Sequence, residues 1–400
     1  MFDKRIAFVT KSPFGPATTT IGGVGSIIRS VATESKRLGA RPMVIVDQYV
    51  KDAPSAKRWV RDGIPVYRFP LLRSIPRSAH LFGKTRRRQL AAWMGLPRVL
   101  KWIRPDLIYF NVSGDGRLRF AYEIKRRLGS KIVGASHGLG GLVLHRGERF
   151  RAKDLHPFWI ESVEAVDAWV PCGPNDERGL LSWGIPEEKV VPVYNGVFVP
   201  DELQPLDKPI RQAGRLRVVF AGRLIEEKGI LELADAMVEV AGLLPDFDLH
   251  LCLAGAFTAG MDRIVEARLT RGGCRLDWEI PGEVPPEEVE RLLLSSDIFC
   301  HPSRGPEGLP LSVLEAGAYG CPLVLSDIPA HRSVFEAGVH ALFHRAGDAS
   351  ELALSIARLA TDEELRLRLR ANAHGLVKRR YNREKMLRRY MKLFDELLSC

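Results

Sequence analysis

Short apolar runs of strand length alternate along this chain with stretches of helical period. In the first such unit, an apolar run at residues 6–10 precedes Ile27, Ile28 and Val31, which recur at the spacing of one helix face. Gly39 follows that stretch, as a helix C-cap would. The alternation predicts a parallel sheet with helices on both faces.

The same alternation continues to the carboxyl-terminal end, with one interruption. Further strands are predicted at residues 42–47, 107–111, 131–136, 168–171, 215–222, 249–254, 276–280, 297–301 and 322–326, and helices at residues 117–128, 229–244, 286–295, 310–319, 350–359 and 382–398. Residues 197–214 contain three prolines and no clear period, which predicts a linker. We therefore expect an α/β chain of two Rossmann-like, doubly wound domains, over residues 1–196 and 215–379.

Length and composition agree with two domains. A chain of 400 residues is long for one core and comfortable for two. No apolar stretch approaches the length of a membrane span, and because the first residues lead straight into a predicted strand, no signal peptide is expected. Six cysteines occur without a Cys-x-x-Cys pair, which favours buried thiols in a reducing cytoplasm.

Basic residues concentrate in the amino-terminal half. Residues 1–200 hold 33 Lys and Arg against 17 Asp and Glu, whereas the remainder holds 26 against 31. A basic half suits an anionic membrane, a lipid diphosphate or nucleic acid, but no nucleic-acid-binding motif is present. Residues 73–104 combine arginines with Trp93 and Trp102, and two interpretations stay open: an interfacial helix on a membrane, or a surface helix that packs its apolar stripe on the sheet.

Candidate chemistry lies in the second half. Glu307 stands in a Gly/Pro-rich loop, and Glu315 follows about two turns into an apolar helix that Pro310 is expected to open as its first residue. Ionised carboxylates accept hydrogen bonds from sugar and ribose hydroxyls, whereas Arg223 and Lys228, beside a glycine-flanked turn, suit a diphosphate. Because ligands bind at the carboxyl ends of strands in open α/β sheets, this combination predicts a nucleotide-sugar site.

Several motifs resemble those of glycosyltransferase family 4, a group of retaining enzymes with the GT-B fold. They are Asn195-Gly-Val197, Gly222-Arg-Leu224, Lys228-Gly229 and the run from Pro302 to Ala316. In the amino-terminal half the resemblance is carried by Gly22-Gly-Val-Gly25, Pro105-Asp-Leu-Ile108 and His137-Gly138. Two positions depart from the family pattern: Cys172, where a serine is usual, and Ser333, where a glutamate is frequent.

The resemblance implies two domains facing a cleft, with a closing helix at about residues 380–400 that returns to the amino-terminal domain. It also implies a retaining transferase that uses a nucleotide-diphosphate sugar. Together with the chemistry above, the expected site residues are Glu307 and His137 at the donor sugar, Arg223 and Lys228 at the diphosphate, Gly308 and Leu309 as backbone N–H donors, Glu315 at the ribose, Gly282 and Val284 at the base, and Gly23 in a loop at the cleft.

No cofactor and no metal ion is expected, because the cationic side chains of Arg223 and Lys228 are interpreted as taking the place of a metal ion at the diphosphate. The expected reaction transfers a hexosyl or N-acetylhexosaminyl group to a glycan or lipid-linked acceptor of envelope polysaccharide or lipopolysaccharide. The protein would lie in the cytoplasm, free or peripheral on the inner face of the membrane. The alternatives are a non-catalytic nucleotide-sugar-binding protein, or an epimerase or phosphorylase on the same architecture. His331 stays open between a site residue and a surface turn.

Overall fold

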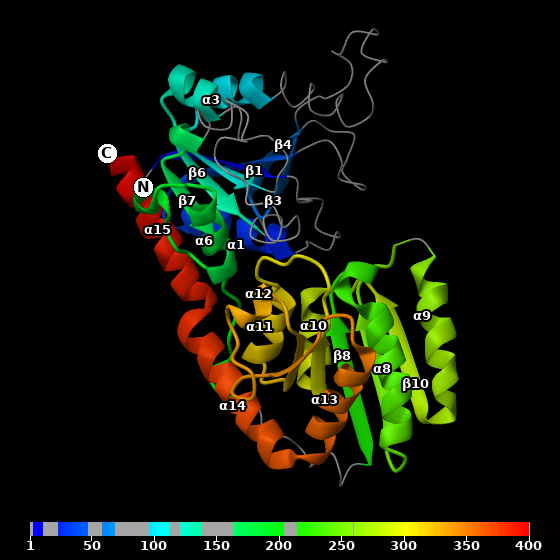
Figure 1. Ribbon diagram of the computed structural model, residues 1–400. Helices are drawn as coiled ribbons and strands as arrows, with labels where there is room; N and C mark the ends of the chain where they lie inside the picture. Colours follow the sequence, from blue (N-terminus) through cyan, green and yellow to red (C-terminus); the bar gives the residue numbers. More distant parts are fainter. Residues whose placement is uncertain are drawn as a thin grey trace. The chain divides into compact units, whose positions relative to one another are not determined.

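The computed structural model describes residues 3–10, 23–46, 58–68, 96–112, 121–137, 163–203, 214–258 and 260–399 (Figure 1). The chain divides into two compact units. Unit 1 consists of Met1–Tyr194 with Met386–Cys400, and unit 2 consists of Asn195–Lys385. Among the described residues, no helix is both long enough and apolar enough to span a bilayer.

Unit 1 is built on a seven-stranded sheet in the order β3-β4-β2-β1-β5-β6-β7, parallel except for the antiparallel β3–β4 pair. Its strands are β1 (Arg5–Thr10), β2 (Arg41–Val46), β3 (Arg58–Arg61), β4 (Ile64–Arg68), β5 (Leu107–Val112), β6 (Lys131–Ser136) and β7 (Ala168–Pro171). Its helices include α1 (Gly23–Arg37), α3 (Ala121–Leu128), α6 (Pro174–Ser182) and most of α15 (Arg383–Ser399). From β1, the strands β2 to β4 lie on one side of the sheet and the strands β5 to β7 on the other. The topological switch point therefore lies between β1 and β5.

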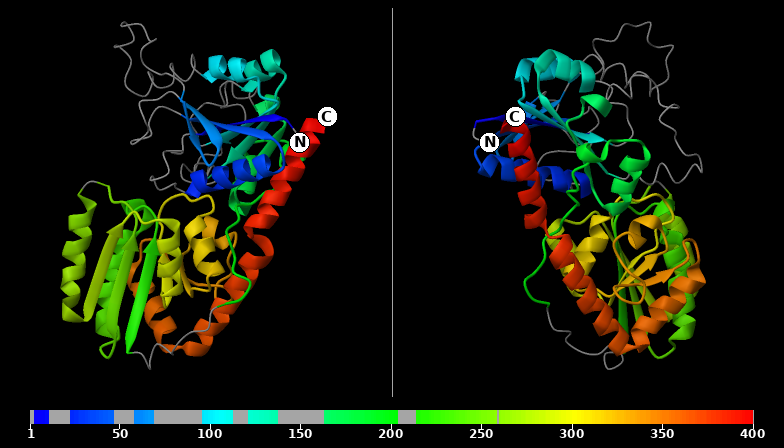
Figure 2. Two further views of the ribbon diagram at one scale, coloured as in Figure 1. Left: turned by 180° about the vertical axis from the view of Figure 1, so that it is seen from behind. Right: turned by 60° about the vertical axis from the view of Figure 1, so that its left-hand side comes forward.

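Both faces of this sheet are covered, as the hydrophobic pattern predicts. One face packs against α3, α6 and a helical stretch at residues 96–103. On the other face, Phe8 and Tyr109 of the sheet pack against Tyr390 and Phe394 of α15. Figure 2 shows α15, in red, beside the sheet of this unit. The last helix therefore completes the amino-terminal core across a very long sequence separation.

The β3–β4 hairpin was not expected from the sequence. Its two short strands join at Asp62-Gly63, where both φ angles are positive, at 52° and 67°. Asp-Gly with this geometry is a strong hairpin signal. This dipeptide could have predicted the hairpin, which the apolar pattern alone did not reveal.

The described part of the basic segment, residues 96–104, agrees with the interpretation of a surface helix that packs on the sheet. Leu96, Leu100 and Ile103 are buried in the core of unit 1, so this part packs an apolar stripe on the sheet. Trp102 points outward with 69% of its surface exposed and meets the edge of Tyr67. Trp93 and the rest of the segment up to residue 95 lie outside the described residues.

Unit 2 is built on a parallel six-stranded sheet in the order β10-β9-β8-β11-β12-β13. Its strands are β8 (Arg215–Ala221), β9 (Asp248–Ala254), β10 (Leu276–Gly282), β11 (Ile298–His301), β12 (Leu323–Ser326) and β13 (Leu342–His344). Its helices are α8 (Ile230–Leu243), α9 (Met261–Leu269), α10 (Pro286–Leu294), α11 (Leu311–Ala318), α12 (Pro329–Arg332), α13 (Ala349–Thr361) and α14 (Glu363–Arg380), with short 3-10 turns that include η5 (Glu226–Lys228). The switch point here lies between β8 and β11.

Helix α14 also escaped the sequence analysis, for a packing reason. It buries three polar side chains, whose ring or guanidinium nitrogens reach backbone carbonyls: Arg366 reaches Leu359 at 3.0 Å, Arg370 reaches Gly320 at 2.9 Å, and His374 reaches Ala318 at 2.8 Å. Apolar residues of α14 do recur at helical spacing, at Leu365, Leu369, Ala373 and Leu376, but the buried polar residues beside them blur the contrast between its apolar and polar faces.

The thiols behave as expected where they are described. Cys172, Cys252, Cys300 and Cys321 are buried, and none of the four is in a disulfide. The side chains of Cys274 and Cys400 lie outside the described residues.

Candidate active site

The cationic side chains of the site follow β8. Arg223 is exposed just beyond Gly222, and Lys228 is half-buried at the end of η5. Gly255, after the neighbouring strand β9, has a φ of 146°, and a Cβ there would overlap the carbonyl oxygen of Gly222. The turn at Gly255 and the turn that carries Arg223 approach so closely that any side chain at position 255 would displace the Arg223 turn.

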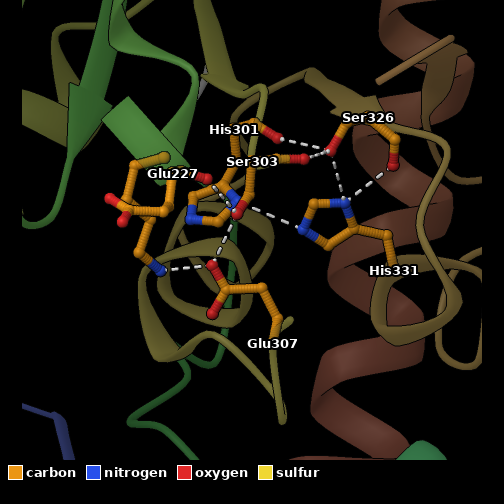
Figure 3. A network of polar contacts seen from close by, with 7 residues as sticks. Glu227, His301, Ser303, Glu307, Ser326 and His331 are labelled. Carbon is orange, nitrogen blue, oxygen red and sulfur yellow. Dashed lines mark hydrogen bonds and ion pairs between the residues drawn. The ribbon is translucent and has the colours of Figure 1, made fainter. Parts of the chain in front are cut away.

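Glu307 follows β11 and meets Lys228. One carboxylate oxygen, Oε1, forms an ion pair with Nζ of Lys228 and also accepts a hydrogen bond of 2.7 Å from the hydroxyl of Ser303 (Figure 3). The side chains of Lys228 and Glu307 are only 15% and 12% exposed. The structure therefore brings together a predicted cation and a predicted carboxylate that stand far apart in the sequence, and shelters both from water.

The two loops that carry this pair are joined along their backbones. The carbonyl oxygen of Glu227 accepts from the N–H groups of Arg304 and Gly305, at 2.8 and 3.1 Å. Gly229 has a φ of 71°, and a Cβ there would overlap the carbonyl oxygen of Pro302. A larger residue at position 229 would push the loops apart, so the glycine of the Lys-Gly motif serves the geometry of the ion pair.

The second glutamate lies on the helix that follows. Glu315 is in α11, and burial raises the pKa of its carboxyl group. The backbone N–H groups of Gly308 and Leu309 donate to no other backbone or side-chain group within the described ranges, so they remain available to an anion. The prediction for Pro310 was wrong by one position: its ψ of 119° is extended, so it caps α11 and Leu311 is the first helical residue.

Gly282 ends β10, and Val284 follows it half-buried. Gly282 has a φ of 76°, and its carbonyl oxygen accepts from the N–H of Gly255 at 2.8 Å. Both residues thus lie at the carboxyl end of an edge strand, on the same edge of the sheet as Arg223. Their contact with a base stays a prediction.

A pair of buried histidines stands behind Glu307, and sequence analysis did not join them. Nδ1 of His301, the last residue of β11, lies 3.1 Å from Nε2 of His331 in α12. Burial lowers the pKa of both rings, to about 4 for His331. His331 is therefore no surface turn residue. The signal that could have found the pair is the position of each histidine at or just after the end of a predicted strand.

In unit 1, polar side chains also gather at the carboxyl ends of the strands. Asp176 is fully buried in α6 and accepts a hydrogen bond from the hydroxyl of Ser136, which ends β6. His137 follows, and neither of its ring nitrogens, both buried, has a hydrogen-bond partner among the described residues. Burial lowers the pKa of His137 to about 4, although the charge of Asp176 opposes the shift. Asp176 was missed because no motif marks it.

Gly23 was expected in a loop, and this was wrong in detail. Gly23 is the first residue of α1, which begins after β1 beside the switch point of unit 1. N–H groups in a first helical turn lack intrahelical acceptors, so they remain suited to an anionic group. Gly22 lies outside the described residues.

Two Rossmann-like units with largely parallel sheets, one with the Lys228–Glu307 ion pair at its switch point, have the architecture of a GT-B glycosyltransferase. Residues 22–196 match the protein family described as "Glycosyl transferase 4-like domain", and residues 206–375 match the family described as "Glycosyl transferases group 1". The two matches span most of the chain, which belongs to glycosyltransferase family 4. The predicted fold class is confirmed.

Relatives are spread over many glycosylation systems. The chain is 24% identical over 291 residues to an uncharacterized glycosyltransferase of Methanocaldococcus jannaschii, covering 70% of this chain and 72% of the relative. It is 25% identical over 231 residues to an amylovoran biosynthesis glycosyltransferase of Erwinia amylovora, covering 55% and 54%. It is 35% identical over 112 residues to the N,N'-diacetylbacillosaminyl-diphospho-undecaprenol alpha-1,3-N-acetylgalactosaminyltransferase of Campylobacter jejuni, covering 28% and 29%.

Solved structures of similar fold cover nearly the whole chain. The Anabaena protein HepE in complex with UDP and glucose aligns with a TM-score of 0.72 at 19% identity, over 98% of this chain and 100% of that one. Sucrose-phosphate synthase from Thermosynechococcus elongatus aligns with a TM-score of 0.77 at 18% identity, over 99% of both chains. At these identities the likeness shows the fold alone.

Proposed function

We propose that this glycosyltransferase moves a hexosyl or N-acetylhexosaminyl group from a nucleotide-diphosphate sugar to an acceptor, with retention of anomeric configuration. The observation that carries the proposal is the Lys228–Glu307 pair at the carboxyl ends of β8 and β11. These strands flank the switch point, where open α/β sheets bind ligands. A fixed cation suits the departing phosphate, and a carboxylate suits sugar hydroxyls.

Each site residue has a role in this proposal. Arg223 and Lys228 would neutralise the charge that develops on the β-phosphate as its bond to the sugar breaks. The N–H groups of Gly308 and Leu309 would add donors at the amino-terminal end of α11. Glu307 would hold sugar hydroxyls with its second oxygen, Oε2, which has no hydrogen bond within the described ranges.

The remaining assignments belong to the ends of the ligand. Glu315 would accept hydrogen bonds from the ribose diol. Gly282 and Val284 would border the base. His137 would contact the donor sugar with one of its ring nitrogens, neither of which has a hydrogen-bond partner among the described residues.

The proposed step keeps its atoms and protons in balance. The acceptor hydroxyl attacks the anomeric carbon on the face from which the phosphate leaves, so the sugar–phosphate bond breaks as the new glycosidic bond forms. The acceptor's proton passes to the leaving phosphate. No carboxylate nucleophile is needed, in contrast with double displacement, and cationic side chains take the place of a metal ion at the diphosphate.

The acceptor is proposed as a glycan or lipid-linked glycan of envelope polysaccharide or lipopolysaccharide. Curated relatives are named for amylovoran biosynthesis and for transfer to a diphospho-undecaprenol-linked sugar. The basic amino-terminal half suits an anionic lipid or its diphosphate. The activity of each relative is its own, so the acceptor of this chain rests on charge and kinship together.

Peripheral contact with an anionic membrane is proposed for unit 1. The lining of a surface depression at the amino ends of its strands includes six basic residues and one acidic residue, Asp106, which pairs with Arg5; the basic residues are Lys4, Arg5, Lys101, Arg104, Arg127 and Lys131. Exposed Trp102 lies on the same helical stretch as Lys101. Indole rings and basic side chains suit lipid interfaces. Sedimentation with vesicles that contain anionic phospholipid, weakened by Lys101→Glu and by salt, would support this contact; equal sedimentation with neutral vesicles would oppose it.

Thermal stabilisation by nucleotides tests the site. A ligand that binds only the folded state stabilises it, by about 2.7 kcal/mol at a concentration of a hundred times Kd, and so raises the melting temperature of the protein. UDP, GDP, ADP and their sugars would be compared on the wild type, Arg223→Ala and Glu315→Ala. A shift with one nucleotide that both variants lose supports the site and names the base. No shift with any nucleotide would oppose the proposal, and a shift without donor hydrolysis or transfer would favour a binding protein.

A further inference from the structure

The Glu307 carboxylate has one oxygen that the protein itself holds. Oε1 receives both Nζ of Lys228 and the hydroxyl of Ser303, while Oε2 has no hydrogen bond within the described ranges. Rotation of the carboxylate would break two bonds at once. The orientation of the free oxygen therefore depends on Ser303 as much as on Lys228.

Ser303 lies at the junction of the two loops. Its side chain is fully buried, and its hydroxyl hydrogen has two acceptors within reach, Oε1 of Glu307 at 2.7 Å and the carbonyl oxygen of Glu227 at 3.1 Å. The shorter distance and the negative charge favour the carboxylate. Neutral Ser303 thus anchors the ion pair without competing for its charge.

The backbone of Ser303 is held in turn by the next strand (Figure 3). Its carbonyl oxygen accepts from the hydroxyl of Ser326, at the end of β12, over 2.6 Å. The carbonyl oxygen of Ser326 lies 2.8 Å from Nδ1 of His331, and Nε2 of that ring lies 3.1 Å from Nδ1 of His301. Hydrogen bonds therefore connect the ends of β11 and β12 to the loop that carries Glu307.

The tautomers of the two histidines follow from the acceptor at one end. A carbonyl oxygen only accepts, so Nδ1 of His331 carries a hydrogen and its Nε2, in the neutral ring, must accept from Nδ1 of His301. Burial lowers the pKa of both rings, and the positive charge of Lys228 lowers them further. Both rings are neutral at pH 7, and one direction of hydrogen bonding is selected.

We propose that the buried chain His301–His331–Ser326–Ser303 is a positioning device for Glu307, which holds its carboxylate so that the free oxygen meets the donor sugar. This deepens the proposed function and rests on it. The four residues touch no substrate in this account, and Ser303 is the last link. Precise placement of a group that acts in the transition state affects kcat more than it affects nucleotide binding.

Ser303→Ala tests the device through two measurements. A hydrogen bond to a charged group is worth roughly 1.5–3 kcal/mol, so kcat for donor hydrolysis should fall about 10- to 100-fold. Affinity for UDP and GDP, which lack the sugar, should change less than about twofold, since Arg223 and Glu315 are untouched. UDP-glucose and GDP-mannose serve as donors.

A double-mutant cycle separates positioning from mere stability. If Ser303 acts through Glu307, Ser303→Ala should cost little further in a Glu307→Gln background. Ser296→Ala is the matched control, because that buried hydroxyl donates to the carbonyl oxygen of Leu293 at 2.8 Å at the opposite end of β11. The control should lose stability but keep kcat.

His331→Asn and His331→Leu keep the test decisive if Ser303→Ala folds poorly. Asparagine can still donate to the carbonyl oxygen of Ser326, whereas leucine cannot, so the Asn variant should retain more of kcat. Additive losses in the Glu307→Gln background, or parallel losses of kcat and UDP affinity, would overturn the device alone. A wild type that neither binds nor hydrolyses any donor would overturn the proposed function and this inference with it.

Discussion

Each unit buries a histidine near the carboxyl ends of its parallel strands, His137 in unit 1 and His331 in unit 2. The two histidines differ in the hydrogen bonds of their ring nitrogens. Both ring nitrogens of His331 are paired, with Ser326 and His301. Both ring nitrogens of His137 are buried and unpaired within the described ranges. Oδ1 of Asn111, at the end of the neighbouring strand β5, is unpaired there as well.

In the site around His331, the polar side chains are held in place by hydrogen bonds to one another. In the site around His137, buried polar atoms have no hydrogen-bond partner within the described ranges. A buried polar atom without a partner costs about 1–3 kcal/mol, so nothing in folding alone favours it. Behind Glu307 in unit 2, the polar groups of Ser303, Ser326, His301 and His331 pair with one another and are preorganised. In unit 1 the unpaired groups favour ligand binding, which agrees with the donor-sugar role proposed for His137.

The largest expected effect lies in the preorganised site. Lys228→Met should lower kcat/KM roughly 100- to 1,000-fold, because it removes a fixed cation from the leaving phosphate. Arg268→Met is the control, since Arg268 pairs with Asp235 in the same unit away from the strand ends. Steady-state kinetics of transfer check the pair of variants. A loss below threefold for Lys228→Met would remove the lysine from the proposed step.

Acid should destabilise both units through their histidines. The folded pKa of His331 and of His137 is about 4, below the ordinary 6.5. The unfolded state then binds more protons between these values, so stability is full above pH 6.5 and falls as pH drops toward 4. Each histidine accounts for up to about 3 kcal/mol, at about 1.4 kcal/mol per unit of pKa difference.

Urea denaturation between pH 7 and pH 4.5 measures this slope. The groups that act on His331 include Glu307, which opposes the shift, and Lys228 and His344, which favour it. His137 has Asp176 as an opposing charge. His331→Gln and His137→Gln should each flatten the slope, and an unchanged slope in both would show that other groups control acid stability.

A smaller difference should appear in the stability effects of replacing each histidine by leucine. His331→Leu leaves Nδ1 of His301 without its acceptor and should destabilise by roughly 1–3 kcal/mol. His137→Leu abandons no hydrogen bond within the described ranges and should be neutral or slightly stabilising, while transfer activity falls. Urea denaturation at pH 7.5 checks the signs. Equal destabilisation by both variants would erase the contrast between the units.

The smallest expected effect is that of metal removal. If cationic side chains replace a metal ion at the diphosphate, excess chelator should change activity less than about twofold. Among the described residues, no group of three or more His, Cys, Asp or Glu side chains could hold a metal ion. Activity that chelator abolishes and Mg²⁺ or Mn²⁺ restores would contradict metal independence.

The unequal success of sequence analysis follows from how each feature is encoded. Strands β6 and β7 match their predicted bounds, because each is a short, mostly apolar run that is almost wholly buried. The β3–β4 hairpin was missed because its strands are short, and α14 because buried arginines lie beside its apolar residues and blur the pattern. Among site residues, motifs marked Arg223, Lys228 and Glu307, yet Asp176 lies in no motif and became visible only through its burial.

The sequence by itself determined the two-domain parallel architecture and the chemical kinds of group at the site, because hydrophobic period and motif spacing are local properties. Only the tertiary structure decided which groups meet. Lys228 and Glu307 are 79 positions apart, and His301 and His331 are 30 apart. Such pairs form because parallel strands place their carboxyl ends on one edge of a sheet, and burial there selects the partners that satisfy each hydrogen bond.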